Sequence, residues 1–398
     1  MLAGWRKNLY IICAAELVAI LGFSTSFPFL PLFIQELGVT ELEQVEIWSG
    51  LLVTGGAVAM AVFSPLWGSV ADHFGRKLML ERAMFGGALT IGAMGLVANV
   101  HQLLALRILQ GCLTGTAAAA TMLVASIVPR DKFGYSLGLI HTAVLGGSSL
   151  GPLLGGLVAD SMGYRPAFWA TGAMLLMAGL AILAFVEERF EPAARNAGSA
   201  AGWFFKDLGL IARSKTMWAM VLAIFFLQIG RNSDGPVLPL FVQSLSPSGR
   251  RAASTTGVIL GASAFIGALT AAAVGRISDR IGHKRTLIGC ILGGAALYAP
   301  QAFVSDATQL LVLRAAMGAL LGGLAPTANA MIATIAPEGK QGSTYGLTAS
   351  ATALGNAIGP ILGATIAATL GIRSVFLGIA AILALVAVWV AGAVTVPK

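Results

Sequence analysis

The sequence predicts an all-α membrane protein with twelve transmembrane helices in two six-helix bundles related by pseudo-symmetry. Composition, the length of the apolar runs and an internal repeat lead to this fold class. Of the 398 residues, 57% are hydrophobic and 11% are charged, whereas soluble domains carry roughly a quarter charged residues. The apolar residues gather in runs long enough to cross a hydrocarbon layer, which takes about 20 residues of helix.

Twelve apolar runs approach or exceed this length, and each is expected to be one membrane-spanning helix. In chain order they cover residues 8–34, 47–70, 78–99, 102–127, 136–160, 165–187, 216–242, 254–277, 285–303, 308–333, 343–369 and 373–396. Little chain remains between them, so no sizeable soluble domain is expected.

A short polar element occurs twice, each time between two apolar runs. The segment from Gly68 to Lys77 is matched 207 residues later by the segment from Gly275 to Lys284. At an offset of 207 or 208, the other matches are Arg107 with Arg314, Gly111 with Gly318, Gly151-Pro152 with Gly359-Pro360, Arg165 with Arg373, and Phe23–Phe33 with Arg231–Phe241. Each copy holds six helices, an even number, so both copies enter the membrane in the same direction.

The repeat sets the expected domain organisation. Residues 1–187 should form the N-terminal bundle, and residues 216–398 the C-terminal bundle. The polar segment 188–215, which contains Pro192 and Gly198, is expected to be the cytoplasmic linker between the two bundles.

The basic residues are distributed unevenly over the loops. With the N-terminus inside, 18 lysines and arginines fall on the cytoplasmic side and 4 on the other side. This bias predicts that both termini are cytoplasmic in a multi-pass protein of a bacterial-type inner membrane. The net charge of +8 is therefore explained by topology, and no nucleic-acid partner is expected.

The first polar element resembles the signature loop of the major facilitator superfamily, a family of membrane transporters. Its residues here are Gly68, Asp72, Gly75, Arg76 and Lys77. The resemblance covers the whole chain, and it implies the fold of that superfamily and a cytoplasmic latch between the halves, with Asp72 as the central acceptor. From the residues alone, the element could also be a simple turn with a basic anchor at the membrane surface.

The fifth predicted helix carries a second resemblance. Gly147, Gly151, Pro152, Gly155 and Gly156 match the motif associated with drug:proton antiporters of the superfamily. A proline inside a helix removes one hydrogen bond, and glycines four residues apart form a smooth face. The alternative interpretation is close helix packing without a role in exchange.

Four ionisable residues within predicted spans are candidates for proton coupling, because such groups are expensive in a membrane. Glu16 has no cation in its own helix, and a carboxyl group removed from water can load and release a proton. Arg107 lies in an element that resembles the superfamily segment linked to proton transfer. Arg231 and Asp234 are three residues apart in the seventh helix, where they could form an ion pair or take part in coupling.

A central substrate cavity is expected from sparse polar, aromatic and methionine side chains within the spans. Such side chains suit an adaptable and mostly apolar pocket. The candidate lining residues are Phe23, Phe27, Gln110, Gln228, Asn232, Met317, Asn329 and Asn356.

These observations predict a secondary transporter that exports small amphipathic or drug-like molecules by proton antiport with alternating access. No enzyme activity, metal site or cofactor beyond the proton gradient is expected, and no nucleotide-binding P-loop is present. The expected partners are a small-molecule substrate, protons and the lipid bilayer, with the chain acting as a monomer. The alternatives are a proton-coupled importer or exporter of sugars, lipids or other metabolites, and a membrane sensor or scaffold without transport.

Overall fold

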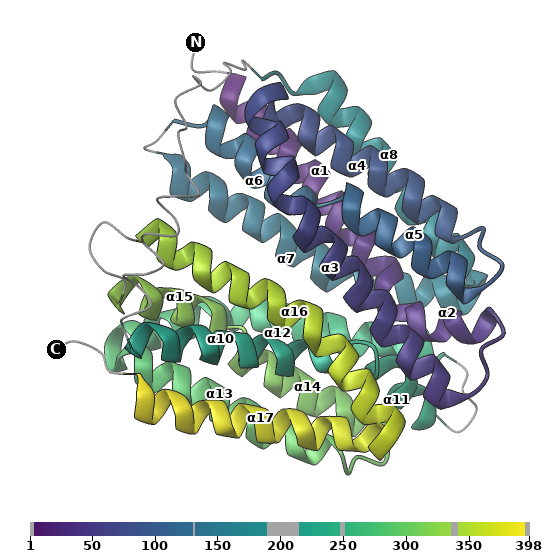
Figure 1. The fold of residues 1–398 in the computed structure, drawn as a ribbon, viewed down its shortest axis with the longest axis vertical. Coiled ribbons are helices and arrows are strands. Elements are labelled where there is room, and N and C mark those ends of the chain that lie inside the picture. Colours follow the sequence, from purple (N-terminus) through teal and green to yellow (C-terminus); the bar gives the residue numbers. More distant parts are fainter. Residues whose placement is uncertain (1–3, 130–131, 189–214, 247–250, 336–340, 395–398) are drawn as a thin grey trace. The chain divides into compact units, whose positions relative to one another are not determined.

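The computed structural model describes residues 4–129, 132–188, 215–246, 251–335 and 341–394 (Figure 1). All regular elements in these ranges are helices. The chain forms two compact units. The first unit comprises Met1–Ala193 and Val242–Gly261, and the second comprises Ala194–Phe241 and Ala262–Lys398.

The helices follow the two copies of the repeat. Those of the first copy are α1 (Gly4–Ser26), the 3-10 helix η1 (Phe27–Phe29), α2 (Leu30–Glu36), α3 (Leu42–Phe74), α4 (Arg76–Met94), α5 (Val100–Leu113), α6 (Thr116–Ile127), α7 (Phe133–Met162) and α8 (Tyr164–Phe185). Those of the second copy are α10 (Lys215–Ser233), α11 (Leu238–Ser244), α12 (Ala252–Ile281), α13 (His283–Gln301), α14 (Ala307–Leu321), α15 (Leu324–Ile335), α16 (Gln341–Leu370) and α17 (Ile372–Ala393).

Each predicted span corresponds to one helix or to two or three consecutive helices. Four spans are interrupted, at residues 27–29, 114–115, 234–237 and 322–323. The break at 234–237 contains the Gly235-Pro236 pair, and a proline lacks the N–H donor that would continue the helix. At Gly115 the chain adopts φ +121, a conformation that favours glycine.

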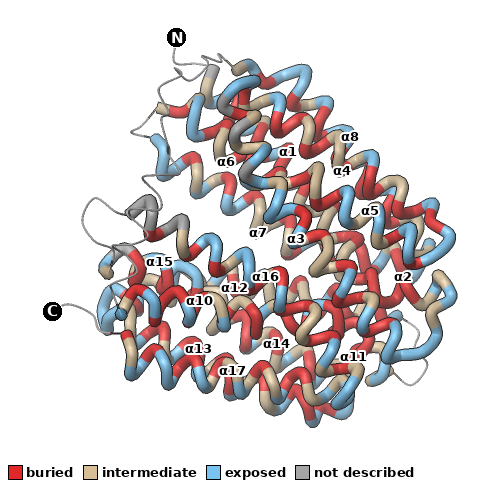
Figure 2. Tube along the Cα trace, in the orientation of Figure 1, coloured by how far each residue is buried: buried red, intermediate tan, exposed pale blue. Residues whose placement is uncertain are grey.

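Nine helical segments of the described residues are long and apolar enough to cross a membrane. Of the predicted spans, those formed by α4, α10 with α11, and α13 are not among the nine, and each carries charged side chains. Buried and exposed positions alternate along the helices (Figure 2). Large apolar side chains such as Leu89 and Phe303 are more than 70% exposed, as expected of a surface that faces lipid rather than water.

The repeat recurs in the tertiary contacts inside each unit. Arg165 donates to the carbonyl oxygen of Gly95 over 3.0 Å, and its repeat partner Arg373 donates to that of Ala302 over 2.9 Å. The ammonium groups of Lys77 and Lys284 likewise reach backbone carbonyls of α8 and α17, which are equivalent helices. The two copies therefore share side-chain contacts as well as helix order.

Most of the predicted connector 188–215 lies outside the described residues, which include only Glu188 and Lys215 of it. The boundaries of the two bundles at residues 187 and 216 remain predictions.

Candidate functional site

The loop between α3 and α4 turns at a glycine whose conformation excludes most other residues. Gly75 has φ +103, and its repeat partner Gly282 has φ +97. Gly68 has open space around it, so no close packing requires a glycine there. Asp72 lies in the last turns of α3, but its side chain is outside what the structure describes. Its role as the acceptor of a latch stays a prediction.

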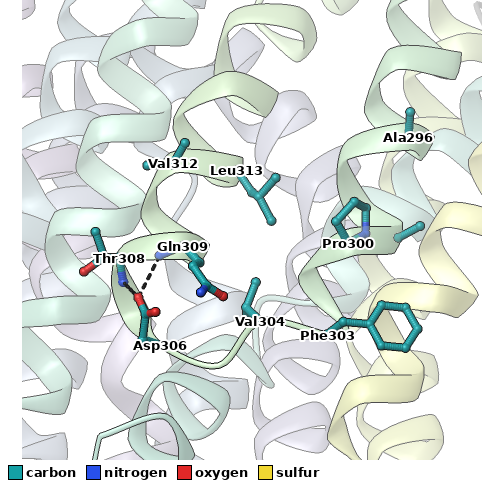
Figure 3. A pocket seen from close by; sticks show the side chains of 10 residues that line it. Ala296, Pro300, Phe303, Val304, Asp306, Thr308, Gln309, Val312 and Leu313 are labelled. Carbon is teal, nitrogen blue, oxygen red and sulfur yellow. Dashed lines mark hydrogen bonds between the residues drawn. The ribbon is translucent and has the colours of Figure 1, made fainter.

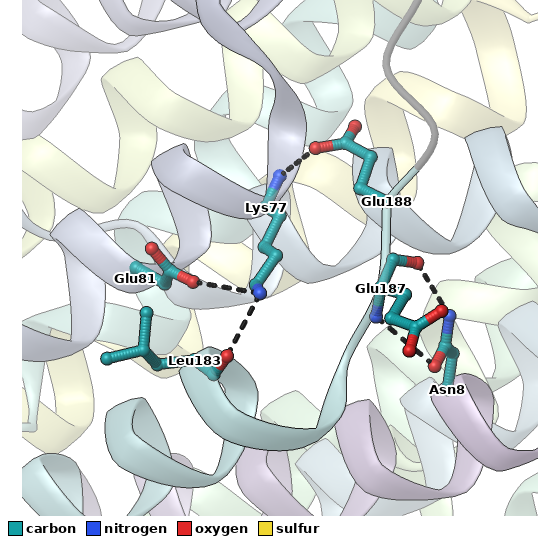
Figure 4. A network of polar contacts seen from close by, with 6 residues as sticks. All are labelled: Asn8, Lys77, Glu81, Leu183, Glu187 and Glu188. Atoms are coloured by element: carbon teal, nitrogen blue, oxygen red, sulfur yellow. Dashed lines mark hydrogen bonds and ion pairs between the residues drawn. The ribbon is translucent and has the colours of Figure 1, made fainter.

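The amino end of α4 is capped by a carboxylate that follows α8. Glu188 Oε1 accepts a hydrogen bond from the amide of Arg76 over 3.0 Å, and Oε2 accepts one from the amide of Lys77 over 2.8 Å. The first amides of a helix lack partners within it, and the helix dipole favours a negative charge there. The Lys77 ammonium also lies 3.6 Å from Glu81 and donates to the carbonyl of Leu183 (Figure 4). These contacts tie the loop to the end of α8.

Replacing Glu188 by alanine should loosen the first turn of α4. Loss of a helix cap destabilises by about 1 kcal/mol, so hydrogen exchange at the Arg76 and Lys77 amides should rise about fivefold. Glu187→Ala is the matched control, because the Glu187 side chain is exposed and only its backbone is held, by Asn8. Equal exchange in the Glu188 and Glu187 variants would show that the cap does not stabilise this turn.

The glycines of α7 bring it into close contact with α1. A Cβ atom at Gly147, Gly151 or Gly155 would collide with backbone or Cβ atoms of α1. One at Gly156 would collide with the start of α12. Pro152 lies inside α7, which continues to Met162.

The same packing occurs in the second copy, where Gly355, Gly359 and Gly363 of α16 lie against α10. Close packing is therefore common to both copies, and an exchange role for the first remains a prediction.

Glu16 is a buried carboxyl group without a cation. Its side chain is 0% exposed, and it lies 12 residues into α1, about 18 Å from the start of the helix. The Thr116 hydroxyl donates to Oε1 over 3.2 Å. Oε2 has no hydrogen-bond partner within the described residues. No ion pair joins Glu16 to any residue that the structure describes, Arg107 included.

Arg107 lies among three of the predicted cavity residues. Its guanidinium donates to Gln110 Oε1 and stacks 3.9 Å from the ring centre of Phe27. Phe27 in turn packs against Phe23, with 5.6 Å between ring centres. Gln110 Nε2 donates to the Thr114 hydroxyl over 2.6 Å. The structure thus brings Phe23, Phe27, Gln110 and Arg107 together, while Glu16 contacts α6.

The second unit holds a buried ion pair that differs from the expected one. Asp234 Oδ2 lies 2.5 Å from Arg314 Nη1 and accepts a hydrogen bond of 3.2 Å from the Tyr298 hydroxyl. Asp234, Arg314 and Tyr298 are each at most 5% exposed. The ion pair suggested between Arg231 and Asp234 is not formed, because Asp234 faces α13 and α14 while Arg231 is exposed.

The two copies of the repeat differ at this position. In the aligned segments, Asp234 corresponds to Ser26. The Ser26 hydroxyl is 2.5 Å from that of Thr171 and donates to the Ala167 carbonyl. Arg107, the repeat partner of Arg314, consequently pairs with no carboxylate among the described residues. This serine-to-aspartate difference is the sequence signal for the Asp234–Arg314 pair.

Three amide side chains of the predicted cavity form one cluster on α10 and α16. Asn356 Oδ1 accepts hydrogen bonds from Gln228 Nε2 over 3.1 Å and from Asn232 Nδ2 over 2.9 Å. Met317 is instead buried against Gln301, and Asn329 lies exposed on α15.

An open groove at the ends of α13 and α14 contains none of the predicted site residues (Figure 3). Its lining is mainly apolar and includes Pro300, Phe303 and Val312. The one carboxylate, Asp306, accepts hydrogen bonds from the amides of Thr308 and Gln309 as the cap of α14. Because Asp306 is exposed and serves as a helix cap, the groove offers no buried ionisable group among its lining residues.

Buried ionisable groups inside long apolar helices, together with a duplicated six-helix unit, define a secondary transporter of the membrane. The chain matches the family model of the Major Facilitator Superfamily over residues 12–307 and 220–398, and it belongs to that superfamily. It is thus a multi-pass membrane transporter and not an enzyme, and both the predicted fold class and the family resemblance are confirmed.

Similar proteins agree with this assignment. The chain is 35% identical to the multidrug resistance protein MdtG of Citrobacter koseri over 328 residues, or 82% of this chain and 80% of that protein. It is 35% identical over 335 residues to the multi-drug resistance efflux pump PmrA homolog of Lactococcus lactis, or 84% and 82% of the two chains. Its fold is similar to the solved structure of the nucleoside transporter NupG, with a TM-score of 0.80 at 12% identity over 98% of this chain and 100% of that chain.

Proposed function

We propose that the chain exports small amphipathic, drug-like molecules in exchange for protons, by alternating access across a bacterial-type inner membrane. The names of its relatives support export of drugs. The excess of basic residues on one side of the spans supports cytoplasmic termini.

The observation that carries proton coupling is Glu16. Glu16 is 0% exposed and pairs with no cation among the described residues, and an ionised carboxylate in such a place is far costlier than a neutral carboxyl group. Glu16 is therefore expected to be protonated while buried and to release the proton when the transport cycle opens it to water. Its single hydrogen bond from Thr116 leaves Oε2 free to hold the proton.

Asp234 is a second candidate carrier, and it acts in a different way. Protonation of Asp234 would remove the negative charge that balances Arg314. Because an unpaired buried charge is strongly unfavourable, protonation would couple to a rearrangement of α10 against α14. The Tyr298 hydroxyl donates a hydrogen bond to the same carboxylate oxygen of Asp234 that contacts Arg314.

The test uses the purified full-length protein in proteoliposomes that contain a pH-sensitive dye. Addition of drugs of varied chemistry should drive proton movement opposite to drug movement. Proton movement in the same direction as the substrate would instead establish a proton-coupled importer. If no compound is transported while sugars or other metabolites are, the drug-export proposal fails.

A further inference from the structure

The buried carboxyl group of Glu16 and the aromatic residues of the predicted cavity lie on the same span but well apart along it. Glu16 precedes Phe23 of α1 by about 10 Å and Phe27 of η1 by about 16 Å at the rise of a helix. Among the described residues, no hydrogen bond or ion pair joins Glu16 to Arg107, which stacks on Phe27. An effect of Glu16 on the cavity that is carried by contacts therefore passes through other residues.

Two threonines on either side of a helix break connect the two regions. The Thr116 hydroxyl, at the start of α6, donates to Glu16 Oε1 over 3.2 Å. The Thr114 hydroxyl, at the end of α5, accepts from Gln110 Nε2 over 2.6 Å. Gln110 Oε1 accepts in turn from Arg107 Nη1. The contacts run from Glu16 to Arg107 with one covalent step, the backbone between the threonines. We define the α5–α6 relay as Gln110, Thr114, Gly115 and Thr116.

The polar side chains of the relay are buried and held in one orientation. Thr116 is 3% exposed, and Thr114 and Gln110 are each 5% exposed. The Thr114 methyl group packs against Gly87 of α4, and its hydroxyl also donates to the Gln110 carbonyl over 2.9 Å. A buried polar group that loses its partner is destabilising, because water cannot replace that partner. Displacement of one member of the relay therefore favours a change at the next.

The break between the two threonines has the properties of a hinge. Gly115 has φ +121, and a Cβ atom there would meet nothing within 4 Å, so the backbone conformation requires the glycine and the packing does not. Thr114 is extended, with φ −97 and ψ −166, while Thr116 already belongs to α6. Hinges are element ends that absorb changes of φ and ψ. A rotation at Gly115 turns α6 relative to α5 without breaking either helix.

The second copy of the repeat lacks this relay. At the offset of 207 its three polar side chains are replaced by apolar residues or glycine, namely Met317 for Gln110, Leu321 for Thr114 and Gly323 for Thr116. Gly322, the repeat partner of Gly115, has φ −57 and ψ −34, which is a helical conformation. Glu16 is matched by Ile224 at the offset of 208. The repeated architecture therefore does not require the relay, which belongs to the copy that carries Glu16.

We propose that the α5–α6 relay couples the protonation of Glu16 to the position of Arg107, so that its side chains are positioning residues of proton-coupled transport. When Glu16 releases its proton to water, its hydrogen bond from Thr116 changes strength, because an ionised carboxylate is a stronger acceptor than a neutral carboxyl group. Among the described residues, no ionisable side chain of α6, α7 or α8 pairs with Glu16, and its titratable neighbour is the Cys13 thiol one turn earlier. This inference rests on the proposed proton exchange.

The test measures coupling and transport separately in proteoliposomes of the full-length protein. The probes are ethidium, norfloxacin and chloramphenicol, which are a cation, a zwitterion and a neutral molecule. Accumulation driven by an imposed pH gradient depends on proton coupling, whereas counterflow without a gradient needs binding and alternating access alone. Accumulation divided by the counterflow rate is the coupling ratio, and it is measured with each probe that the wild-type protein accumulates.

Five variants and a control separate coupling from structure. Thr116→Val and Thr114→Val each remove one hydroxyl and keep the branched shape, so each should lower the coupling ratio about fivefold, the effect of one buried hydrogen bond. Thr116→Ser and Thr114→Ser keep the hydroxyl and should retain most of the ratio. Gly115→Ala should lower it, because alanine disfavours φ +121. The matched control is Thr121→Val, since the Thr121 hydroxyl of α6 donates to the backbone carbonyl of Ala117 over 2.7 Å.

The double variant Thr114→Val, Thr116→Val decides whether the two threonines act on one path. Its coupling ratio should equal that of the weaker single variant, because a path that is already cut loses nothing more. Losses that multiply would overturn the inference, and so would a Thr114→Val ratio equal to that of Thr121→Val. Both results leave the proposed export intact, whereas a wild-type protein that accumulates none of the three drugs contradicts the export itself. Unfolding temperatures close to that of Thr121→Val show that a lowered ratio is not a folding defect.

Discussion

An Asp234→Asn variant is expected to be strongly destabilised and inactive. The substitution removes the only carboxylate that contacts Arg314 among the described residues, and Arg314 is 4% exposed. Breaking a buried ion pair from one side typically costs about 3–5 kcal/mol. The apparent Tm in detergent should therefore fall by on the order of 10 °C.

The double variant Asp234→Asn, Arg314→Met should recover most of this loss. With both charges removed, neither partner is left unpaired in an apolar environment, and such replacements are often neutral. The measurement is a double-mutant cycle of thermal unfolding, with Asp279→Asn at an exposed position of α12 as the control. Additive losses in the cycle would mean that the two side chains do not interact.

Glu16→Gln should abolish proton-driven transport and leave exchange intact. Glutamine keeps the shape of the side chain and can accept the Thr116 hydrogen bond, but it cannot release a proton. In proteoliposomes with a pH gradient, substrate accumulation should fall to the level of equilibration. Counterflow without a gradient should persist within about twofold of wild type, because that reaction needs no net proton transfer.

The control for this prediction is Glu43→Gln, because Glu43 lies exposed near the start of α3. It removes one carboxyl group at an exposed position, in a different helix from Glu16. Substrate accumulation driven by the pH gradient in Glu16→Gln would refute Glu16 as an essential carrier and leave Asp234 as the candidate. Loss of both accumulation and counterflow would show that Glu16 has a role in binding or folding instead.

The helices could be predicted because the signal for a membrane span is local. A run of apolar residues long enough to cross the hydrocarbon layer marks a helix whatever it packs against. The breaks were harder to predict. A Gly-Pro pair such as Gly235-Pro236 favours an interruption. Glycines alone, as at Thr114-Gly115 and Gly322-Gly323, do not indicate one, because they are also common in uninterrupted membrane helices.

Two features of the candidate site depended on contacts between distant parts of the chain. Glu188 was not singled out, because its position just after the sixth span does not reveal that it caps α4. Arg231 and Asp234 lie three residues apart, and their spacing suggested a local pair. The pairing of Asp234 with Arg314, 80 residues away, decides which charge is neutralised.

The amino-acid sequence by itself determined the class of protein. Composition, spacing of apolar runs and the repeated loop predict twelve helices in two copies, because lipid requires every span to satisfy its own backbone hydrogen bonds. Only the tertiary structure decided how the intramembrane charges are divided. Among the residues that the structure describes, Glu16 has no cation partner, Asp234 is paired with Arg314, and Arg231 forms no ion pair, since neutralisation depends on contacts of a few ångströms between helices.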